Sequence, residues 1–221
     1  MQITDDMHLK AVVFDWDLTL WNSWDIHLRL MLQTAAVLAY PQPNGADLAR
    51  EYSRLFLEHL AWFFPGGQER VVDTYMGFYH TAVWQERRLY AGVEELLRQL
   101  KVKGYLTAVL SDKRQFFGVP EFEHSELSPV IDRTLFLTDG MAPKPDPAGL
   151  HDVMESLGVT PAECVFVGDS HRDIQCAQRA GAWSGAALWA SVERERVLAL
   201  EPDFLWKKVG DLGVTLKLWR T

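Results

Sequence analysis

The chain has 221 residues, of which 48% are hydrophobic and 24% charged, so it can bury one core with an inserted second unit and is too apolar to be largely disordered. Its formal net charge is −8 and it has no dense lysine and arginine stretch, which argues against general binding to nucleic-acid backbones. Residues 1–6 lack the features of a signal peptide, no apolar stretch is long enough to span a membrane, and two cysteines are too few for a disulfide framework, so we expect a cytoplasmic protein.

The first predicted element is a short, buried strand over residues 10–14, which is apolar and rich in β-branched residues. Residues 22–89 then show no clear strand pattern. They show three helical patterns instead, over about 24–39, 47–64 and 68–88, separated by proline- and glycine-containing breaks at 40–45 and 65–67. This all-helical block is therefore a candidate second domain.

From residue 90 onward, the pattern alternates between helix and strand. Helices are predicted at 93–103, 146–157 and about 172–180, and strands at 106–110, 135–137, 164–167 and 184–188. Strands separated by helices of this length pair in parallel through right-handed crossovers. The predicted fold class is α/β, a doubly wound, Rossmann-like parallel sheet formed by residues 1–21 and 90–221, with an inserted all-helical domain at 22–89. The C-terminal segment is expected to cover one edge of the sheet.

Polar residues follow several of the predicted strands, and parallel strands present their carboxyl ends at one edge, where ligands bind. These residues are Asp15 and Asp17, Ser111-Asp112-Lys113, Lys144 between two prolines, and Gly168-Asp169-Ser170. Two carboxylates at a strand end are costly to bury without a metal or a reacting electrophile. Taken alone, Asp15 and Asp17 favour chemistry only modestly over a solvated turn with a helix-capping Asp, and Lys144 alone would be interpreted as an exposed loop lysine. Because all of these residues are expected at one edge of the sheet, a ligand-binding or catalytic site is favoured over a solvated turn.

These residues resemble the four sequence motifs of the haloacid dehalogenase-like hydrolases. Asp15-x-Asp17-x-Thr19 is similar to the first motif, Ser111 to the second, Lys144 to the third and residues 168–173 to the fourth. The resemblance is strongest to the branch of phosphoglycolate phosphatase and β-phosphoglucomutase, and it implies that residues 22–89 form a helical cap domain. The chain departs from the family at Leu18, where glycine is usual, at Asp112, where asparagine is commoner, and over 116–120, which is poor in helix-forming residues.

The resemblance implies an aspartyl-phosphate mechanism. Asp15 would be the nucleophile and Asp17 the general acid and then the base. Asp17 also points to phosphate chemistry, because a halide leaving group needs no acid. Asp15, Asp169 and the backbone carbonyl of Asp17 would hold Mg²⁺, a hard cation that prefers oxygen ligands.

The remaining motif positions would bind phosphate or support the site. Ser111, Asp112 with its amide, and Lys144 would bind the phosphoryl group, and Thr19 would have a supporting role. Asp173 would orient Lys144 or a water on the metal, although a helix-capping or solvated role is an alternative.

The predicted function is a Mg²⁺-dependent phosphatase, a phosphoric monoester hydrolase, that acts on a small phosphorylated metabolite as a monomer or homodimer. It is expected to bind neither nucleic acid nor membrane. The alternatives are a phosphomutase on the same scaffold and a catalytically idle binding protein with this fold. His27, His59 and His80 of the predicted cap are expected to be structural or solvated, with His27 a weak hint of a mutase, and Arg172 to lie at a solvated helix start.

Overall fold

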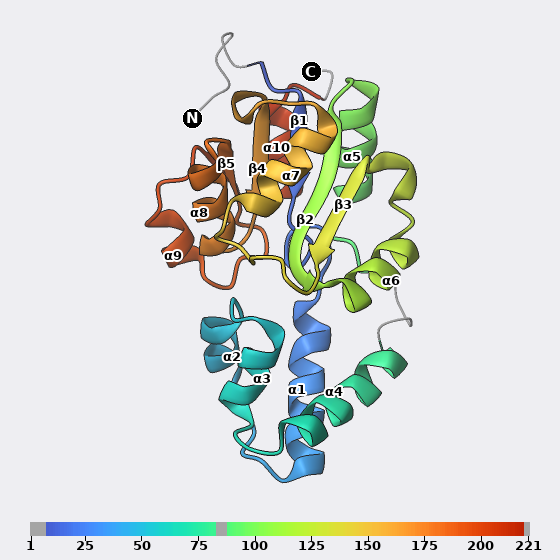
Figure 1. Ribbon diagram of the computed structural model, residues 1–221, viewed down its shortest axis with the longest axis vertical. Helices are drawn as coiled ribbons and strands as arrows, with labels where there is room; N and C mark the ends of the chain where they lie inside the picture. The colour runs from blue at the N-terminus through green and yellow to red at the C-terminus, as the bar shows by residue number, and fades with distance from the viewer. Residues whose placement is uncertain (1–7, 83–87, 219–221) are drawn as a thin grey trace. The chain divides into compact units, whose positions relative to one another are not determined.

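The computed structural model describes residues 8–82 and 88–218, and its chain divides into two compact units (Figure 1). The first comprises Met1–Asn22 with Leu89–Thr221, and the second Ser23–Arg88. None of the described helices is both long and apolar enough to cross a membrane. That the second unit acts as a cap stays a prediction.

The first unit is built on a six-stranded sheet in which every strand pairs in parallel with its neighbours. In space the order is β3-β2-β1-β4-β5-β6, for strands β1 (Ala11–Phe14), β2 (Leu106–Arg114), β3 (Arg133–Leu137), β4 (Cys164–Gly168), β5 (Trp183–Ala187) and β6 (Phe204–Trp206). β1 lies inside the sheet and is buried along its whole length, which explains its unbroken apolar sequence. The predicted doubly wound α/β fold is confirmed.

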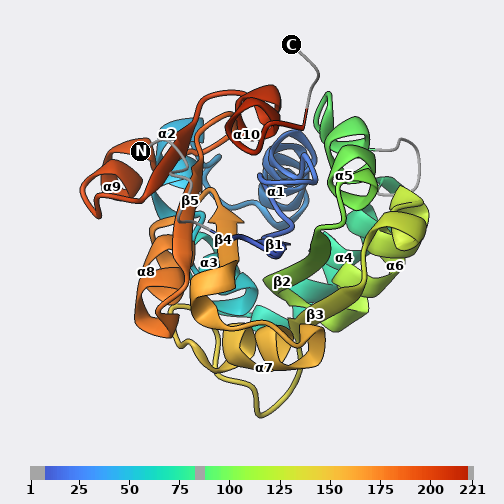
Figure 2. The same cartoon turned by 90° about the horizontal axis from the view of Figure 1, so that it is seen from above.

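Helices cover both faces of this sheet (Figure 2). They are α5 (Val93–Val102), α6 (Gln115–Ser125), α7 (Ala148–Leu157), α8 (His171–Ala180), α9 (Arg194–Leu198) and α10 (Val209–Thr215), with short 3₁₀ helices η2 (Ser128–Val130) and η3 (Pro161–Glu163). Successive β1 side chains face opposite layers: Val12 and Phe14 pack in one core cluster with α5 and α10, whereas Ala11 and Val13 pack with α7 and α8. The sheet is thereby fixed from both sides, with its carboxyl edge carrying the polar residues.

Two parts of this unit differ from the sequence prediction. Residues 116–120 were expected to be poor in helix, yet they lie within α6, whose Phe117 and Glu121 are buried. Gly118 allows this helix to approach the sheet, because a Cβ there would lie 2.2 Å from Phe136 Cδ1. The C-terminal segment does more than cover an edge: β6 adds a sixth strand, and the ring of Trp206 lies against Gly185. In α6, packing overrides a weak local helix propensity.

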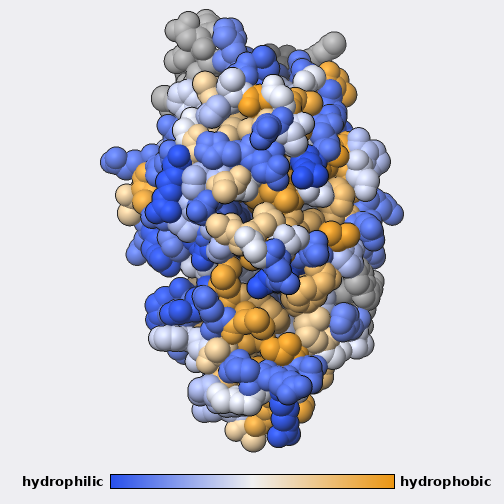
Figure 3. Space-filling view, in the orientation of Figure 1, coloured by the Kyte–Doolittle hydropathy of each residue, from blue (hydrophilic) through white to orange (hydrophobic). Residues whose placement is uncertain are grey.

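The described residues of the second unit form four helices, α1 (Trp24–Leu38), α2 (Gly45–Glu51), α3 (Phe56–Phe63) and α4 (Gln68–Ala82). The single helix predicted at 47–64 is wrong: it is two helices, because the backbone turns after Glu51 and Leu55 is extended (φ −61°, ψ 147°). The predicted third helix continues to residue 88, but residues 83–87 lie outside the described part of the chain. Val37, Leu57 and Trp62 are each more than half exposed. On the face of the molecule drawn in Figure 3, hydrophobic residues lie among hydrophilic ones.

A chain of hydrogen bonds runs through the interior of the helical unit. His59 Nδ1 donates to the carbonyl of Glu51 (2.8 Å), since a carbonyl can only accept. His59 Nε2 therefore accepts from His27 Nε2 (3.0 Å), and His27 Nδ1 accepts from the Tyr75 hydroxyl (2.9 Å). Both histidines are buried, and burial lowers the pKa of His59 below its usual range. These contacts give His27 and His59 a structural role, while His80 is exposed.

Candidate active site

The site begins where β1 ends. Phe14 pairs with Val109 of β2 and with Val167 of β4, so Asp15 and Asp169 follow the ends of β1 and β4 at the level where Ser111 lies in β2. The strand register thus brings together residues that lie far apart in the sequence. Asp15 is buried, and its backbone N–H donates to the carbonyl of Val167 (2.8 Å).

The turn after Asp15 keeps a glycine-like shape without a glycine. Leu18 has a left-handed backbone (φ 56°), a conformation that costs most residues energy and glycine almost none. Its N–H donates to the carbonyl of Trp21 (2.9 Å), and its side chain is fully buried. Packing thus compensates the conformational cost, and the Leu18 departure from the family pattern leaves the turn in place.

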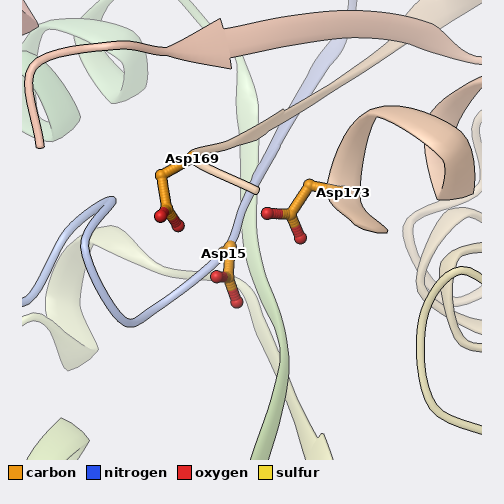
Figure 4. Close-up of side chains that lie close together, drawn as sticks. All are labelled: Asp15, Asp169 and Asp173. Carbon is orange, nitrogen blue, oxygen red and sulfur yellow. The ribbon is translucent and has the colours of Figure 1, made fainter. Parts of the chain in front are cut away.

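Three buried carboxylates converge at this edge, from the end of β1, the end of β4 and the first turn of α8 (Figure 4). The ligand oxygens of Asp15, Asp169 and Asp173 all lie within 4.8 Å of one another. Burial raises the pKa of Asp15 to about 7, and Lys144 opposes that shift. Burial and the neighbouring carboxylates Asp173 and Asp15 raise the pKa of Asp169 well above its usual range. The cluster therefore favours binding of a positive charge.

Lys144 places an ammonium ion against two of these three carboxylates. Its Nζ donates to Asp173 Oδ1 (2.6 Å) and lies 2.9 Å from Asp15 Oδ1. Asp173 Oδ2 meanwhile accepts from the backbone N–H of Ser170 (3.0 Å) and from its hydroxyl (2.6 Å). Asp173 thus both orients Lys144 and caps helix α8, which combines the two alternatives derived from the sequence.

The residues of the predicted second motif lie in the carboxyl-terminal half of β2. Ser111 is buried and lies within β2, which extends to Arg114. The Asp112 carboxylate accepts from the backbone N–H of Lys144 (2.9 Å) and from Arg172 Nη2 (2.9 Å). A carboxylate repels phosphate, so Asp112 is placed to hold the Lys144 loop, and only its amide suits phosphate binding. Arg172 is correspondingly an ion-pair partner and only 17% exposed, rather than solvated.

Two further contacts fix Asp169. Thr19 Oγ1 lies 3.5 Å from Asp169 Oδ1, and Ser191 Oγ donates to the backbone carbonyl of Asp169 (2.6 Å). The indole of Trp189 donates to the Thr19 carbonyl (3.0 Å). The loop after β5 therefore supports both the first and the fourth motif.

The carboxylate of Asp17 lies apart from the three-carboxylate cluster. Its Oδ1 accepts from Lys113 Nζ (2.9 Å), and the same ammonium lies 2.8 Å from Glu121 Oε2 in α6. Neither Lys113 nor Glu121 has a role predicted from the sequence. For Lys113 the sequence held a signal, because this residue lies just after a predicted strand, at the edge that carries the other motifs. For Glu121 the sequence held no such signal, because this residue lies just beyond a segment expected to be poor in helix.

The donor set suits a divalent cation. Within the described residues, Asp15 Oδ1 is buried and receives no hydrogen bond, although Lys144 lies close to it. Two of the three buried carboxylates, Asp15 and Asp173, pair with the Lys144 ammonium, and all the candidate ligand atoms are hard carboxylate oxygens. This combination fits Mg²⁺. Asp15 and Asp169 are the better candidates for ligands, because Asp173 already accepts hydrogen bonds from Lys144 and Ser170.

Residues 12–187 match the family model described as haloacid dehalogenase-like hydrolase. The chain belongs to the haloacid dehalogenase-like hydrolase family. The resemblance stated from the four motifs is thereby confirmed, and the chain is a member of a hydrolase family.

Relatives and solved structures extend this similarity over nearly the whole chain. The chain is 27% identical over 206 residues to pyrophosphatase PpaX of Bacillus cereus strain G9842, covering 93% of this chain and 95% of that protein. Its fold is similar to a predicted phosphoglycolate phosphatase from Haemophilus somnus (TM-score 0.83, 22% identity, 95% and 99% covered). It is also similar to a candidate β-phosphoglucomutase from Thermotoga maritima (TM-score 0.80, 20% identity, 96% and 100% covered).

Proposed function

We propose that this hydrolase is a Mg²⁺-dependent phosphatase that acts on a small phosphorylated substrate through an aspartyl-phosphate on Asp15. The observation that carries this proposal is the convergence of Asp15, Asp169 and Lys144 at one buried sheet edge. Relatives named as phosphatases, among them a pyrophosphatase, support the same class of reaction.

Asp15 is the nucleophile of the proposed reaction. One oxygen of its carboxylate forms a bond to phosphorus while the bond between phosphorus and the leaving-group oxygen breaks. Asp17 supplies a proton to that leaving oxygen. In the second step Asp17 takes a proton from water, whose oxygen attacks phosphorus and releases phosphate, and Asp15 returns to its carboxylate form. Acid–base assistance of this kind contributes about 10²–10⁴-fold.

The surrounding residues lower the electrostatic cost of bringing two anions together. Lys144, held by Asp173, places an ammonium beside Asp15 and neutralises charge on the phosphoryl group. The Ser111 hydroxyl and the Asp112 amide, in the neighbouring strand β2, would donate to phosphoryl oxygens. Mg²⁺ held by Asp15 and Asp169 would supply further charge neutralisation for the phosphoryl oxygens.

The test is turnover of a panel of phosphate compounds by the purified chain. p-Nitrophenyl phosphate, inorganic pyrophosphate and small phosphorylated metabolites are each assayed with Mg²⁺ and with EDTA. We expect Mg²⁺-dependent phosphate release that Asp15→Asn abolishes, because the amide is not a nucleophile for phosphorus. Asp139→Asn is the matched control, since Asp139 is a fully exposed carboxylate paired with Arg114.

The same assay separates the alternatives. A requirement for a bisphosphate primer and a rearranged sugar phosphate as product would favour a phosphomutase. Absence of Mg²⁺-dependent turnover on every compound would contradict the proposal and favour a binding protein with this fold. Acid quenching during turnover, followed by mass spectrometry, should find one phosphoryl group on the peptide that contains Asp15.

A further inference from the structure

A second polar cluster lies beside the site and is centred on Glu121 of α6. Glu121 Oε2 accepts from Trp16 Nε1 (2.8 Å), and Lys113 Nζ lies 2.8 Å from the same oxygen. The side chain of Glu121 is only 2% exposed. A carboxylate this deeply buried is costly unless charged and polar donors compensate it, and here both kinds are present.

Lys113 connects this buried carboxylate to Asp17. Its Nζ donates to Asp17 Oδ1 (2.9 Å), so one ammonium lies between two carboxylates. Burial lowers the pKa of Lys113, but Asp17 and Glu121 outweigh it and raise the pKa above its usual range, which keeps the ammonium charged. The pair is shielded from water, because the Lys113 side chain is 11% exposed. Such a pair holds its geometry better than a surface ion pair does.

The contact is selective for one oxygen of Asp17. Oδ1 is engaged by Lys113, and no donor to Oδ2 is found in the described part of the chain. The Asp17 side chain is 23% exposed, so a ligand can reach it. The arrangement fixes the carboxylate through one oxygen and leaves the other for a proton and a leaving group.

Trp16 gives the cluster a rigid base. It lies between Asp15 and Asp17 in the chain, is fully buried, and stacks on Trp21 with ring centroids 5.4 Å apart. It also meets Phe136 edge-on at 6.0 Å. Because these ring contacts restrict the movement of Trp16, the hydrogen bond from its indole N–H holds the Glu121 carboxylate in place.

We propose that Lys113 and Glu121 are positioning residues that hold the Asp17 carboxylate for proton transfer to the leaving group. This inference rests on the proposed phosphatase function and deepens it. Lys113 acts through Asp17, and Glu121 acts through Lys113. Misplacement of a reacting group by about 1 Å can cost about 10²-fold in rate, so the effect is measurable.

The test compares two substrates that differ in their need for a proton. p-Nitrophenolate leaves readily without protonation, whereas phenolate is a much poorer leaving group from phenyl phosphate. In Lys113→Met we expect kcat/KM to fall by about tenfold or more for phenyl phosphate and by less than about threefold for p-nitrophenyl phosphate, because only the first depends strongly on general acid catalysis. General damage to the fold would lower both values by the same factor.

A second variant approaches the cluster from the other side. Glu121→Gln keeps the shape of the side chain and an acceptor for the Trp16 indole but removes the charge that holds Lys113. We expect kcat/KM again to fall more for phenyl phosphate than for p-nitrophenyl phosphate, but by a smaller factor than in Lys113→Met. If this variant fails to fold, the double variant Lys113→Met with Glu121→Gln removes both buried charges together and should show the same difference between the two substrates.

Matched controls test whether any similar change would do the same. Glu123→Gln alters an exposed carboxylate on the same helix. Lys101→Met removes an ammonium paired with Asp132 (2.7 Å) and outside the site. Both should keep the wild-type ratio of the two kcat/KM values.

The outcomes separate the two levels of inference. Equal losses for both aryl phosphates in Lys113→Met and in the double variant, or wild-type kinetics in both, would overturn the positioning role and leave the phosphatase intact. Absence of turnover by the wild-type chain would overturn the proposed function and with it this inference. A selective loss for phenyl phosphate supports both.

Discussion

Gly168 is the position where one added methyl group should damage the site most. It is the last residue of β4, and a Cβ there would lie 2.3 Å from both Cβ and Cγ of Asp173. That distance is 1.1 Å shorter than 3.4 Å, where ordinary van der Waals contact begins. The backbone of Gly168 is not left-handed, so Gly168→Ala adds steric overlap and no conformational strain.

The overlap falls on a side chain that cannot move without losing its contacts. Asp173 is fully buried and accepts from Lys144 Nζ at 2.6 Å and from Ser170. A shift of about 1 Å takes the Lys144 contact beyond the usual hydrogen-bond range. Overpacking costs about 1–3 kcal/mol and loss of a helix cap about 1 kcal/mol, so we expect Gly168→Ala to lower the free energy of unfolding by about 2–4 kcal/mol. If the proposed mechanism holds, kcat should fall by about 10²-fold, because Lys144 loses its anchor.

Urea denaturation followed by circular dichroism measures the first quantity and phosphate release the second. Ser170→Ala separates the cap from the clash, since it removes the hydroxyl and leaves Asp173 in place, and should cost only about 1 kcal/mol. Gly77→Ala is the control for the exchange itself: no atom lies within 4 Å of its added Cβ, and alanine in the interior of α4 should stabilise the chain by about 0.5–1 kcal/mol. Wild-type stability and kcat in Gly168→Ala would refute the reasoning.

Two other predictions concern buried titratable groups. The helical unit should lose stability as the pH falls below 6.5, because burial lowers the pKa of His59 and the unfolded chain then takes up a proton that the folded unit does not. One proton limits this loss to about 1.4 kcal/mol per pH unit, and urea denaturation at about pH 7.5 and about pH 5.5 should show a smaller pH response in His59→Gln than in the wild type. An equal response would contradict the assignment. Burial also raises the pKa of Cys164 and of Cys176 to about 12, so iodoacetamide at about pH 8 should modify neither thiol in the folded chain and both in urea. Rapid labelling of the folded chain would show that the thiols are accessible.

Much of the fold follows from local patterns in the sequence. β1 and β4 are short apolar runs, and amphipathic helices that end at Gly158 and Gly181 separate the later strands. Parallel pairing follows from that alternation, and it places strand ends that carry Asp15 and Asp169 side by side. These features depend on neighbours in sequence or on general rules of chain topology, which explains why they could be predicted.

The elements that were missed depend on contacts between distant residues. α6 includes a segment of weak helix propensity, and it is stabilised by the burial of Phe117 and Glu121. β6 forms by pairing in parallel with β5 at the edge of the sheet. The split between α2 and α3 likewise depends on packing within the helical unit. Local propensity is too weak to decide such cases.

The sequence by itself determined which residues could do chemistry and the strand ends where they lie. The tertiary structure decided which side chains form ion pairs: Asp173 pairs with Lys144, Asp112 with Arg172, and Asp17 with Lys113. Trp16 and Glu121 are 105 positions apart in the chain, and no pattern in the sequence pairs them. Ion pairs and hydrogen bonds are short-ranged, so their partners are set only once the sheet and its helices have brought the side chains within a few ångströms.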